Sequence, residues 1–464
     1  MTTTGRDLAL RRLREAGVSR PAVDTFALHY DALAKGATGL IAEADVEPAL
    51  PTVHLADLEV GEDEARAALD RTAVITLNGG LGTSMGLAGP KSLLPVHEDL
   101  TFLDITVRQV LALRERFGVR LPLLFMNSFS TQQATGKVLA RDPELAVDGL
   151  PLEFLQSQEP KLRADDLAPV QWPADPRLEW CPPGHGDLYP SLLASGLLDQ
   201  LLEQGYRQAF VANVDNLGAV PDARIAAWFA GSGSGYAAEV VRRTEMDKKG
   251  GHLVRRRSDG RLVLRETAQT APEELVHFMD AEKHPYVNTN NLWFDLERLR
   301  TMLDERDGVL PLPLIRNTKT VDPQDPDSTS VIQIETAMGG AVELFDDAVS
   351  IGITRERFVP VKTTNELLLL RSDVYAVDPQ TYLLHRTVDD FLAPVIDLAK
   401  DHYGVIGAFD ERFPHGAPSL VQAQRLDVEG DWTFGREVQV VGSARLGPEG
   451  GQVEDGATLG PGSA

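Results

Sequence analysis

The feature that most constrains this chain is a glycine-rich stretch at residues 77–92 that directly follows a short apolar run. The run, residues 72–76, has the composition of a buried strand, and the stretch after it has the sequence LNGGLGTSMGLAGPKS. Glycines at this density let backbone N–H groups converge on an anionic ligand, and Lys91 adds a mobile positive charge. Taken alone, a glycine cluster is equally compatible with a mobile surface loop. After a buried strand, it predicts a phosphate-binding loop.

This loop matches neither of the two common phosphate-binding motifs. A Walker A loop places lysine directly after glycine, whereas Pro90 separates Gly89 from Lys91 here. A dinucleotide-binding G-x-G-x-x-G motif also fails, because Gly86 follows Gly82 one residue too late. The sequence therefore predicts a phosphate-binding loop of a third kind.

The composition of the chain limits the classes of binding partner and the cellular location that we expect. The chain has 464 residues, a formal net charge of −24 and one cysteine, Cys181. An acidic chain without a long basic run is not expected to bind nucleic acid, although a few local lysines suffice for small phosphorylated ligands. A single cysteine excludes an intramolecular disulfide. The sequence shows no signal peptide and no apolar run of membrane-spanning length, so we expect a cytoplasmic protein without membrane contact.

Alternating strand and helix patterns predict the main domain. Apolar residues at helical spacing mark 104–117 and 192–204, and apolar runs that end in polar residues mark strands at 121–126 and 209–212. Such strands are typical of a doubly wound α/β sheet, whose ligands lie beyond the carboxyl ends of the strands. A basic, β-like segment at 236–266 predicts a hairpin over the site, with arginines that face either a phosphate or solvent.

We expect three domains: an N-terminal helical support at 1–70, built mainly from 6–35, a catalytic domain at 71–378, and a C-terminal domain at 379–464. The last domain is expected to begin with a connecting helix at 380–403. An apolar repeat of six residues follows, with glycines at the intervening turns, and predicts a short parallel, left-handed β-helix. The repeat has two series: Leu420, Leu426, Trp432, Val438 and Ala444, and Val428, Phe434, Val440 and Leu446.

Three ionisable residues stand where a ligand site is expected, and each has a commoner structural explanation. His185 lies in a turn made rigid by prolines and glycines, although a lone histidine is usually structural. Asp215 follows a strand and is well placed to hold Mg²⁺, or else to form an Asx turn. Lys362 ends an apolar strand before an expected helix start, where a lysine can face an anion or extend along the surface.

Two further polar residues suit a polyhydroxylated ligand. Asn290 belongs to a run of three amides in four residues, which could read hydroxyl groups by paired hydrogen bonds or form a turn. Glu335 lies in an otherwise apolar run, where a carboxylate needs a partner. A sugar hydroxyl is one such partner, and a structural hydrogen bond is the commoner one.

Together these motifs resemble the eukaryotic type of UTP–glucose-1-phosphate uridylyltransferase. They occur in that family's order, and the terminal repeat is similar to the family's β-helix tail. The matching segments are LNGGLGTSMGLAGPKS (77–92), FLQSQEPKL (154–162), WCPPGHGDLYPSL (180–192), FVANVDNLGAVPD (210–222), the KGG-containing hairpin (249–251), NTNNLWFDL (288–296), VIQIETAMGGAV (331–342) and RFVPVKTTNELLLLRSDVY (357–375).

The resemblance implies a fold, a reaction and a set of site residues. The fold is a nucleotidyltransferase, Rossmann-like mixed sheet core, and the reaction forms UDP-glucose and pyrophosphate reversibly from UTP and glucose 1-phosphate with Mg²⁺. The implied nucleotide contacts are Leu77, Asn78, Gly79, Gly80, Lys91, Gln156, Gly184, Asp215 and Lys362. Among these, Lys91 and Lys362 match catalytic lysines and Asp215 matches the metal ligand. The implied glucose 1-phosphate contacts are His185, Asn213, Asn290 and Glu335.

Two other functions stay open at this point. A related pyrophosphorylase for N-acetylglucosamine 1-phosphate or galactose 1-phosphate would share the nucleotide loop and Lys91. A nucleotide-sugar-binding module without turnover is the other, but binding alone would not need Lys91, Asp215 and Lys362 together. A homo-oligomer through the β-helix is also implied. The family's longer members carry a further strand there, so no particular oligomer is predicted.

Overall fold

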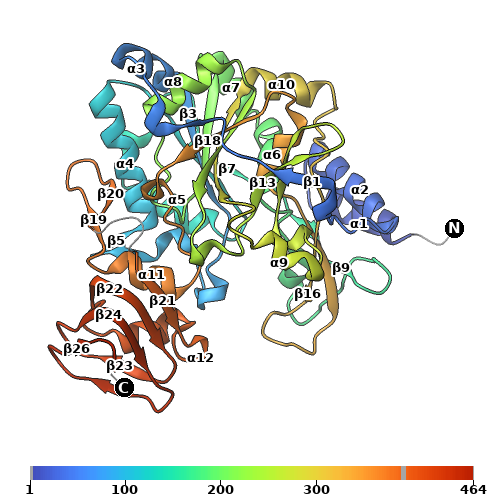
Figure 1. Cartoon of the computed structure of the whole chain (residues 1–464). Helices are drawn as coiled ribbons and strands as arrows, with labels where there is room; N and C mark the ends of the chain where they lie inside the picture. Colours follow the sequence, from blue (N-terminus) through green and yellow to red (C-terminus); the bar gives the residue numbers. More distant parts are fainter. Residues whose placement is uncertain (1–3, 388–392, 463–464) are drawn as a thin grey trace.

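A mixed sheet of eight strands forms the centre of the molecule (Figure 1), for which a computed structural model describes residues 4–387 and 393–462. Neighbouring strands are parallel except at β15, which is antiparallel to both of its neighbours. Every residue of β3 is buried, as expected for a sheet covered on both faces. In spatial order the strands are β2 (Val53–His54), β18 (Val349–Ile353), β12 (Tyr236–Arg242), β15 (Tyr286–Asp295), β11 (Gln208–Asn213), β3 (Thr72–Asn78), β6 (Leu123–Asn127) and β7 (Glu153–Leu155). The predicted α/β core is confirmed.

Helices cover both faces of this sheet, and Figure 1 shows them on its two sides. One hydrophobic cluster joins the sheet to α3 (Glu62–Asp70), α4 (Phe102–Phe117) and α8 (Ala223–Ser232). A second joins it to α6 (Leu188–Ala194), α7 (Leu197–Glu203) and α10 (Leu296–Asp304). The single helix predicted at 192–204 is wrong in one respect. It is broken at Gly196, whose φ of +72° ends α6 before α7 begins.

The N-terminal helices pack against a smaller sheet beside the core. α1 (Gly5–Glu15) and α2 (Arg20–Ala34) share a hydrophobic cluster with β9 (Leu162–Arg163) and β17 (Ser330–Glu335), to which β16 (Ile315–Thr320) is paired. Polar contacts add to this packing. Arg12 forms an ion pair with Glu179, and His29 Nε2 lies 3.0 Å from the carbonyl oxygen of Leu312. The helices predicted within 6–35 are thus confirmed.

The basic segment contains a hairpin, although it begins later than expected. Residues 236–242 form β12 of the central sheet, where all of them but Arg242 are buried, as expected for a strand covered on both faces. The hairpin itself is β13 (His252–Arg256) and β14 (Leu262–Arg265), with β1 (Val46–Pro48) at its edge. Its arginines mostly pair with nearby acids: Arg256 with Glu343, Arg257 with Glu47, and buried Arg265 with Glu43 and Glu274. These contacts favour the structural interpretation of the arginines.

The C-terminal segment consists mainly of parallel strands. One sheet has the order β21 (Val395–Leu398), β22 (Ser419–Val428), β24 (Gln439–Leu446) and β26 (Thr458–Leu459), and a second pairs β23 (Trp432–Phe434) with β25 (Gly451–Val453). The residues of the six-residue repeat are buried apart from Trp432, which is partly buried. They share one hydrophobic cluster with Val361 and with α11 (Thr364–Arg371).

The connecting helix predicted at 380–403 is wrong for the residues described there. Two short strands lie in this range instead: β20 (Leu384–Arg386), which pairs with β19 (Tyr375–Val377), and β21. Only α12 (Lys400–Tyr403) is helical, and α13 (Ile406–Arg412) follows it. Pro394 and the β-branched pair that follows it, Val395-Ile396, disfavour a helix here. Residues 388–392, also within the predicted helix, lie outside the described residues.

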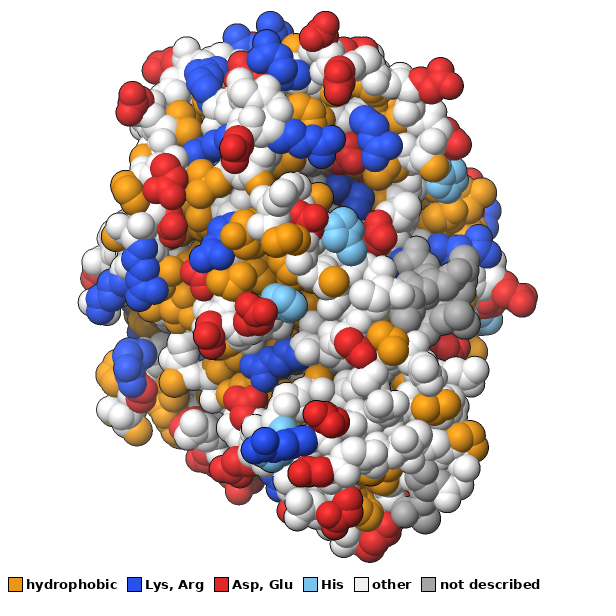
Figure 2. Space-filling model, turned by 90° about the vertical axis from the view of Figure 1, so that its left-hand side faces the viewer, with side chains coloured by type: hydrophobic (Ala, Val, Ile, Leu, Met, Phe, Trp, Pro, Cys, Tyr) orange, Lys and Arg blue, Asp and Glu red, His pale blue; other side chains and the backbone are white. Residues whose placement is uncertain are grey.

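Charged side chains are mixed by sign over the surface shown in Figure 2, where acidic and basic groups alternate instead of gathering into separate fields. In the described part of the chain, no helix combines the length and the apolar character that crossing a lipid bilayer requires.

A buried ion pair joins β12, β15 and the segment that follows β18. Glu239 of β12 is fully buried and accepts hydrogen bonds from Arg357 Nε at 3.0 Å and Nη2 at 2.7 Å. It also accepts from Trp293 Nε1 and Asn291 Nδ2 of β15, both at 3.0 Å. Asn216, just after β11, donates to the backbone oxygen of Arg357. Every oxygen of this carboxylate is therefore satisfied by two donors.

Arg357→Ala should lower the free energy of unfolding by about 3–5 kcal/mol, because it leaves a buried carboxylate without its counter-ion. Arg20→Ala is the matched control, since Arg20 pairs with Asp24 and the two side chains are 84% and 42% exposed. An exposed pair of this kind contributes about 0–1 kcal/mol. Chemical denaturation of both variants measures the difference, and equal losses would contradict the assignment.

Candidate active site

The glycine-rich loop turns back on itself at the carboxyl ends of β3 and β11. Leu77 of β3 and Asn213 of β11 are register partners, and the amide of Val214 donates to the Leu77 carbonyl at 3.1 Å. At the other end of the loop, the amide of Lys91 donates to the Gly80 carbonyl at 3.3 Å. The loop is therefore closed by its own backbone, with Lys91 returned to the strand ends where Asp215 begins the next connection.

Lys91 is held by the segment that also carries Lys362. Its Nζ donates to Asp215 Oδ2 at 2.7 Å and to the carbonyl oxygen of Val361. The amide of Val361 in turn donates to the Asp215 carbonyl at 3.0 Å. Three segments that are far apart in sequence thus bring Lys91, Asp215 and Lys362 together, as the sequence predicts for a phosphate site.

The first half of the loop lies beside Gln156. A Cβ added to Gly79 would lie 2.6 Å from Gln156 Nε2, so glycine permits this close approach, whereas Gly80 has open space around it. The side chain of Asn78 does not have the exposure expected of a ligand contact. Its side chain is buried and donates to Asn127 Oδ1 at 2.7 Å, which ties β3 to β6. Any contact of Asn78 with a ligand would have to come from its backbone.

The turn at Gly184 and His185 is fixed against the segment after β17. Gly184 has φ +80° and ψ 173°, a region that is almost exclusive to glycine. The Met338 amide donates to His185 Nδ1 at 3.0 Å. Packing around the ring lowers the pKa of His185 to about 4, so the imidazole is neutral near pH 7 and Nε2 is left as its N–H donor.

A cavity of about 650 Å³ opens beside the strand ends and is lined by four of the predicted site residues: Asn213, Asp215, Asn290 and Lys362. Asn290 has φ +59°, an unusual backbone conformation for a residue within a strand. Its Oδ1 accepts a hydrogen bond from Asn288 Nδ2 at 2.9 Å. A space of this size suits a nucleotide-sized or sugar-sized ligand.

The remaining predicted residues do not line this cavity, although three of them are joined to it. Lys91 donates a hydrogen bond to Asp215, which lines the cavity. Gly184 and His185 are joined to it through residues 336–339, because Gly339 lies against Asn288 and Asn290. Glu335 lies at the end of β17, with one carboxylate oxygen 3.6 Å from Lys319 Nζ. Its contact with a sugar stays a prediction.

Glu266 is a candidate that sequence reasoning missed. It lines the cavity at the end of β14, and burial raises its pKa while Lys362 opposes that shift. Gly251 leaves its carboxylate room, because a side chain at that position would collide with it. The signal in the sequence was the pair Gly250-Gly251, but nothing there indicates that it faces Glu266 across a hairpin.

The donor set limits how a metal ion could bind. Within the described residues, no group of three or more histidine, cysteine, aspartate or glutamate side chains is arranged to hold one. A metal here would rest on the Asp215 carboxylate and on oxygens of the ligand itself. Mg²⁺ commonly binds in this manner beside nucleotide phosphates, so the residues present fit it.

Comparison with known proteins gives a consistent result. A family model described as UTP–glucose-1-phosphate uridylyltransferase matches residues 24–441. A protein of that name from Solanum tuberosum is 38% identical over 418 residues, which is 89% of this chain and 85% of the relative. The relative of that name from Saccharomyces cerevisiae is 38% identical over 377 residues, covering 81% of this chain and 73% of its own.

Solved structures extend the similarity to the whole chain. A mutant of UDP-glucose pyrophosphorylase from Leishmania major, in complex with UDP-glucose, has a TM-score of 0.93 at 40% identity and covers 100% of both chains. A UDP-glucose phosphorylase from Trypanosoma brucei has a TM-score of 0.90 at 41% identity, covering 98% of this chain and 99% of its own.

Gly184→Ala should destabilise the site more than a matched glycine substitution. An added Cβ would lie 2.5 Å from the Thr336 carbonyl oxygen and 2.9 Å from its amide nitrogen, so the backbone would have to move. Gly205→Ala is the control, because Gly205 has φ +90° but open space. We expect about 1–2 kcal/mol for Gly205→Ala and a further loss of about 1–3 kcal/mol for Gly184→Ala, measured by chemical denaturation. Equal losses would show that the contact with Thr336 is unimportant.

Proposed function

The chain belongs to the UTP–glucose-1-phosphate uridylyltransferase family, and we propose that it forms UDP-glucose and pyrophosphate from UTP and glucose 1-phosphate. The observation that carries this proposal is the convergence of Lys91, Asp215 and Lys362 beside a ligand-sized cavity. A site that transfers a nucleotidyl group must compensate several phosphate charges at one point. Two lysines beside one carboxylate supply that compensation.

The proposed reaction needs positioned charge more than proton transfer. A phosphate oxygen of glucose 1-phosphate attacks the α-phosphorus of UTP in line, the bond to the β-phosphate breaks, and pyrophosphate leaves. The attacking oxygen is already anionic, so no general base is required. Lys91 and Lys362 stabilise the charge that develops at phosphorus and on the leaving group. Because one phosphoanhydride bond forms as another breaks, we propose that the reaction is reversible.

Mg²⁺ is the proposed cofactor, with Asp215 as its protein ligand. When bound, it would neutralise phosphate charge and orient the phosphate groups of UTP. Asp215 Oδ2 now accepts from Lys91 Nζ, so Lys91 occupies the position of a counter-charge beside this carboxylate. Asp215 would therefore have two positively charged partners, the bound Mg²⁺ and Lys91 of the chain itself.

Substrate recognition is proposed to divide between two sides of the site. Leu77, Asn78, Gly79, Gly80, Gln156 and Gly184 would contact the nucleotide, and His185, Asn213, Asn290 and Glu335 the glucose 1-phosphate. Glu266 is added to the sugar side, because its partly buried carboxyl group shares the cavity with Asn290. A carboxyl group and an amide there can each hydrogen-bond a ring hydroxyl, which gives the site a means to discriminate among hexoses.

The C-terminal domain is proposed to be a short left-handed parallel β-helix within the three-domain division at 1–70, 71–378 and 379–464. Val428 pairs with Leu446, three six-residue repeats further along, which is the spacing expected when each coil has three sides. The parallel pairing of the strands in both C-terminal sheets supports this assignment. Association of copies through this domain remains part of the proposal.

Pyrophosphate release from UTP tests the activity and the competing sugars together. The purified protein is assayed with glucose 1-phosphate, galactose 1-phosphate and N-acetylglucosamine 1-phosphate, each with Mg²⁺ and with a chelator in its place. We expect release with glucose 1-phosphate and a loss of release on chelation. Preference for another sugar would support the related pyrophosphorylase instead. No release with any sugar would favour a binding module and contradict the enzyme.

Lys91→Ala and Lys362→Ala should each lower kcat by roughly 10²–10³, by analogy with the removal of one preorganised donor to a transition state. KM should change less, since the charge that each lysine stabilises is largest in the transition state. Exposed Lys35 lies at the end of α2, and Lys35→Ala is the matched control with unchanged kinetics. A folded variant with near-normal kcat would remove that lysine from the mechanism.

A further inference from the structure

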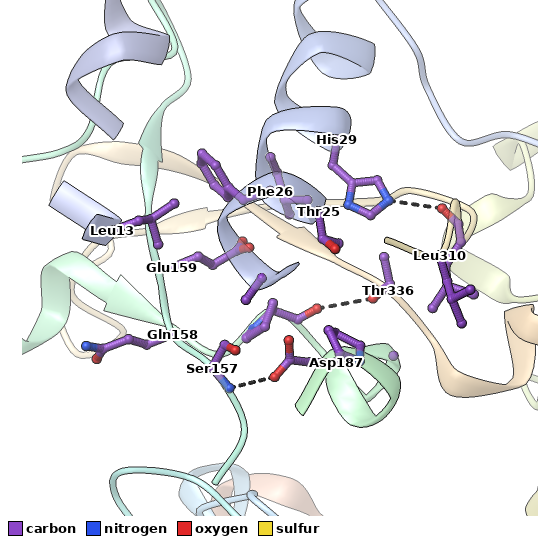
Figure 3. Close-up of a pocket in the computed structure, with 16 residues that line it drawn as sticks. Leu13, Thr25, Phe26, His29, Ser157, Gln158, Glu159, Asp187, Leu310 and Thr336 are labelled. Carbon is purple, nitrogen blue, oxygen red and sulfur yellow. Dashed lines mark hydrogen bonds between the residues drawn. The ribbon is translucent and has the colours of Figure 1, made fainter. Parts of the chain in front are cut away.

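A buried carboxylate lies beside the site without any part in the proposed chemistry. Asp187 belongs to a 3-10 turn at His185–Asp187, immediately before α6, and is 5% exposed. Its Oδ2 accepts a hydrogen bond from the backbone amide of Ser157 at 2.5 Å and another from Ser191 Oγ at 2.7 Å. Figure 3 shows the Ser157 amide directed at this carboxylate. The bond joins the residue after Gln156 to the turn that carries His185.

The two segments that this bond joins are anchored unequally. The turn is fixed to the chain after β17 by three other bonds: Gly186 N–H to the Thr336 carbonyl at 2.9 Å, Thr336 N–H to the Pro183 carbonyl at 3.0 Å, and Met338 N–H to His185 Nδ1. The segment at 156–158 connects β7 to β8 (Glu159–Pro160), and within the described residues it has one backbone bond of its own to the core, from the Gln156 amide to the Asn127 carbonyl at 2.8 Å. Loss of the Asp187 bond should therefore displace the 156–158 segment and leave the turn in place.

Space next to the bond would allow such a displacement. A cavity of about 20 Å³, room for one water molecule, is lined by Ser157, Asp187 and Glu159 together with Thr25 and His29 of α2 (Figure 3). Glu159 is 4% exposed, and its Oε1 has no hydrogen-bond partner. The Ser157 segment therefore borders a void rather than close-packed side chains, so packing alone does not fix its position.

The stability of the folded protein does not explain why an aspartate occupies position 187. Burial raises the pKa of Asp187 to about 6, and the pKa of neighbouring Glu159 is also raised, by burial first and then by the charge of Asp187. A carboxyl group whose folded-state pKa is raised favours folding most when it is protonated. That contribution is lost as the pH rises from about 4 through about 6. At neutral pH its ionised form opposes folding, so the carboxylate does not add stability there.

We propose that Asp187 is a positioning residue of the nucleotide site, whose carboxylate holds the 156–158 segment so that Gln156 stays beside Gly79. This deepens the proposed function and rests on it. Gln156 is proposed to contact the nucleotide, whereas the anchored turn carries the proposed glucose 1-phosphate contact. The role of Asp187 therefore predicts a selective effect on one substrate.

Asp187→Ala should raise KM for UTP by about tenfold or more. The substitution removes a hydrogen bond to a charged group, and the free energy of such a bond corresponds to at least that factor in affinity. KM for glucose 1-phosphate and kcat should stay within about twofold, because the turn keeps its other bonds. Asp187→Asn should restore a UTP KM near that of the wild type. Its amide oxygen can take the place of Oδ2 and accept from both the Ser157 amide and Ser191 Oγ.

Two further variants decide the matter if Asp187→Ala does not fold. Ser191→Ala removes a donor that orients the carboxylate, and a rise in the UTP KM alone would support the proposal. Ser195→Ala is the control, because its hydroxyl donates to the Leu192 carbonyl on the same helix and should change neither KM. A Ser191→Ala variant that behaves like this control would contradict the proposal.

Several results would overturn the proposal that Asp187 positions the 156–158 segment. Equal rises in both KM values, an Asp187→Asn variant as impaired as Asp187→Ala, or a folded Asp187→Ala variant with a normal UTP KM would each refute positioning through this hydrogen bond. Wild-type protein without turnover would refute the proposed function itself. Wild-type turnover with an unaffected Asp187→Ala variant would refute this inference alone.

Discussion

The ion pair between Glu239 and Arg357 is the interaction on which the site depends most. It lies within the central sheet, where Glu239 of β12 meets side chains of β15 and the segment that follows β18. Arg357 is five residues before Lys362, and its carbonyl is bonded to Asn216, the neighbour of Asp215. A charge pair in the core is therefore joined through short stretches of backbone to both proposed catalytic elements. Its two partners come from β12 and from the chain after β18, so tertiary folding must precede site formation.

Charge compensation explains the form of the site itself. Lys91 is already paired with Asp215, so the lysine that we propose to bind phosphate has a fixed position before any phosphate arrives. A preorganised donor of this kind loses little freedom during reaction, which is the physical basis of electrostatic catalysis. Glycines serve the same purpose differently. Gly79 allows Gln156 to approach the loop, and Gly184 adopts a backbone conformation that places His185 beside Met338.

The sequence predictions succeeded where a local pattern had one physical explanation. Strand β3 followed by the glycine loop, the helices within 6–35 and the inward-facing six-residue repeat are all found. The connecting helix at 380–403 failed, because a short alternating stretch such as Val395–Leu398 pairs with a distant strand that no local pattern reveals. Asn78 lies at the end of β3, beside the glycine loop, but its side chain donates a hydrogen bond to Asn127 on the neighbouring strand. Glu266 and Asp187 were missed because their importance lies in partners far along the chain.

By itself the sequence determined the class of fold, the family and the residues able to carry phosphate chemistry, because glycine spacing, apolar periodicity and ordered motifs are local properties. Only the tertiary structure decided which of those residues meet. It joined Lys91 to Asp215, placed Asn290 and Lys362 on one cavity, left Glu335 outside it and set Asp187 against Ser157. The reason is that hydrogen bonds and ion pairs at such a site form between connections of different strands. Their distances are fixed by sheet order and register, which no single segment encodes.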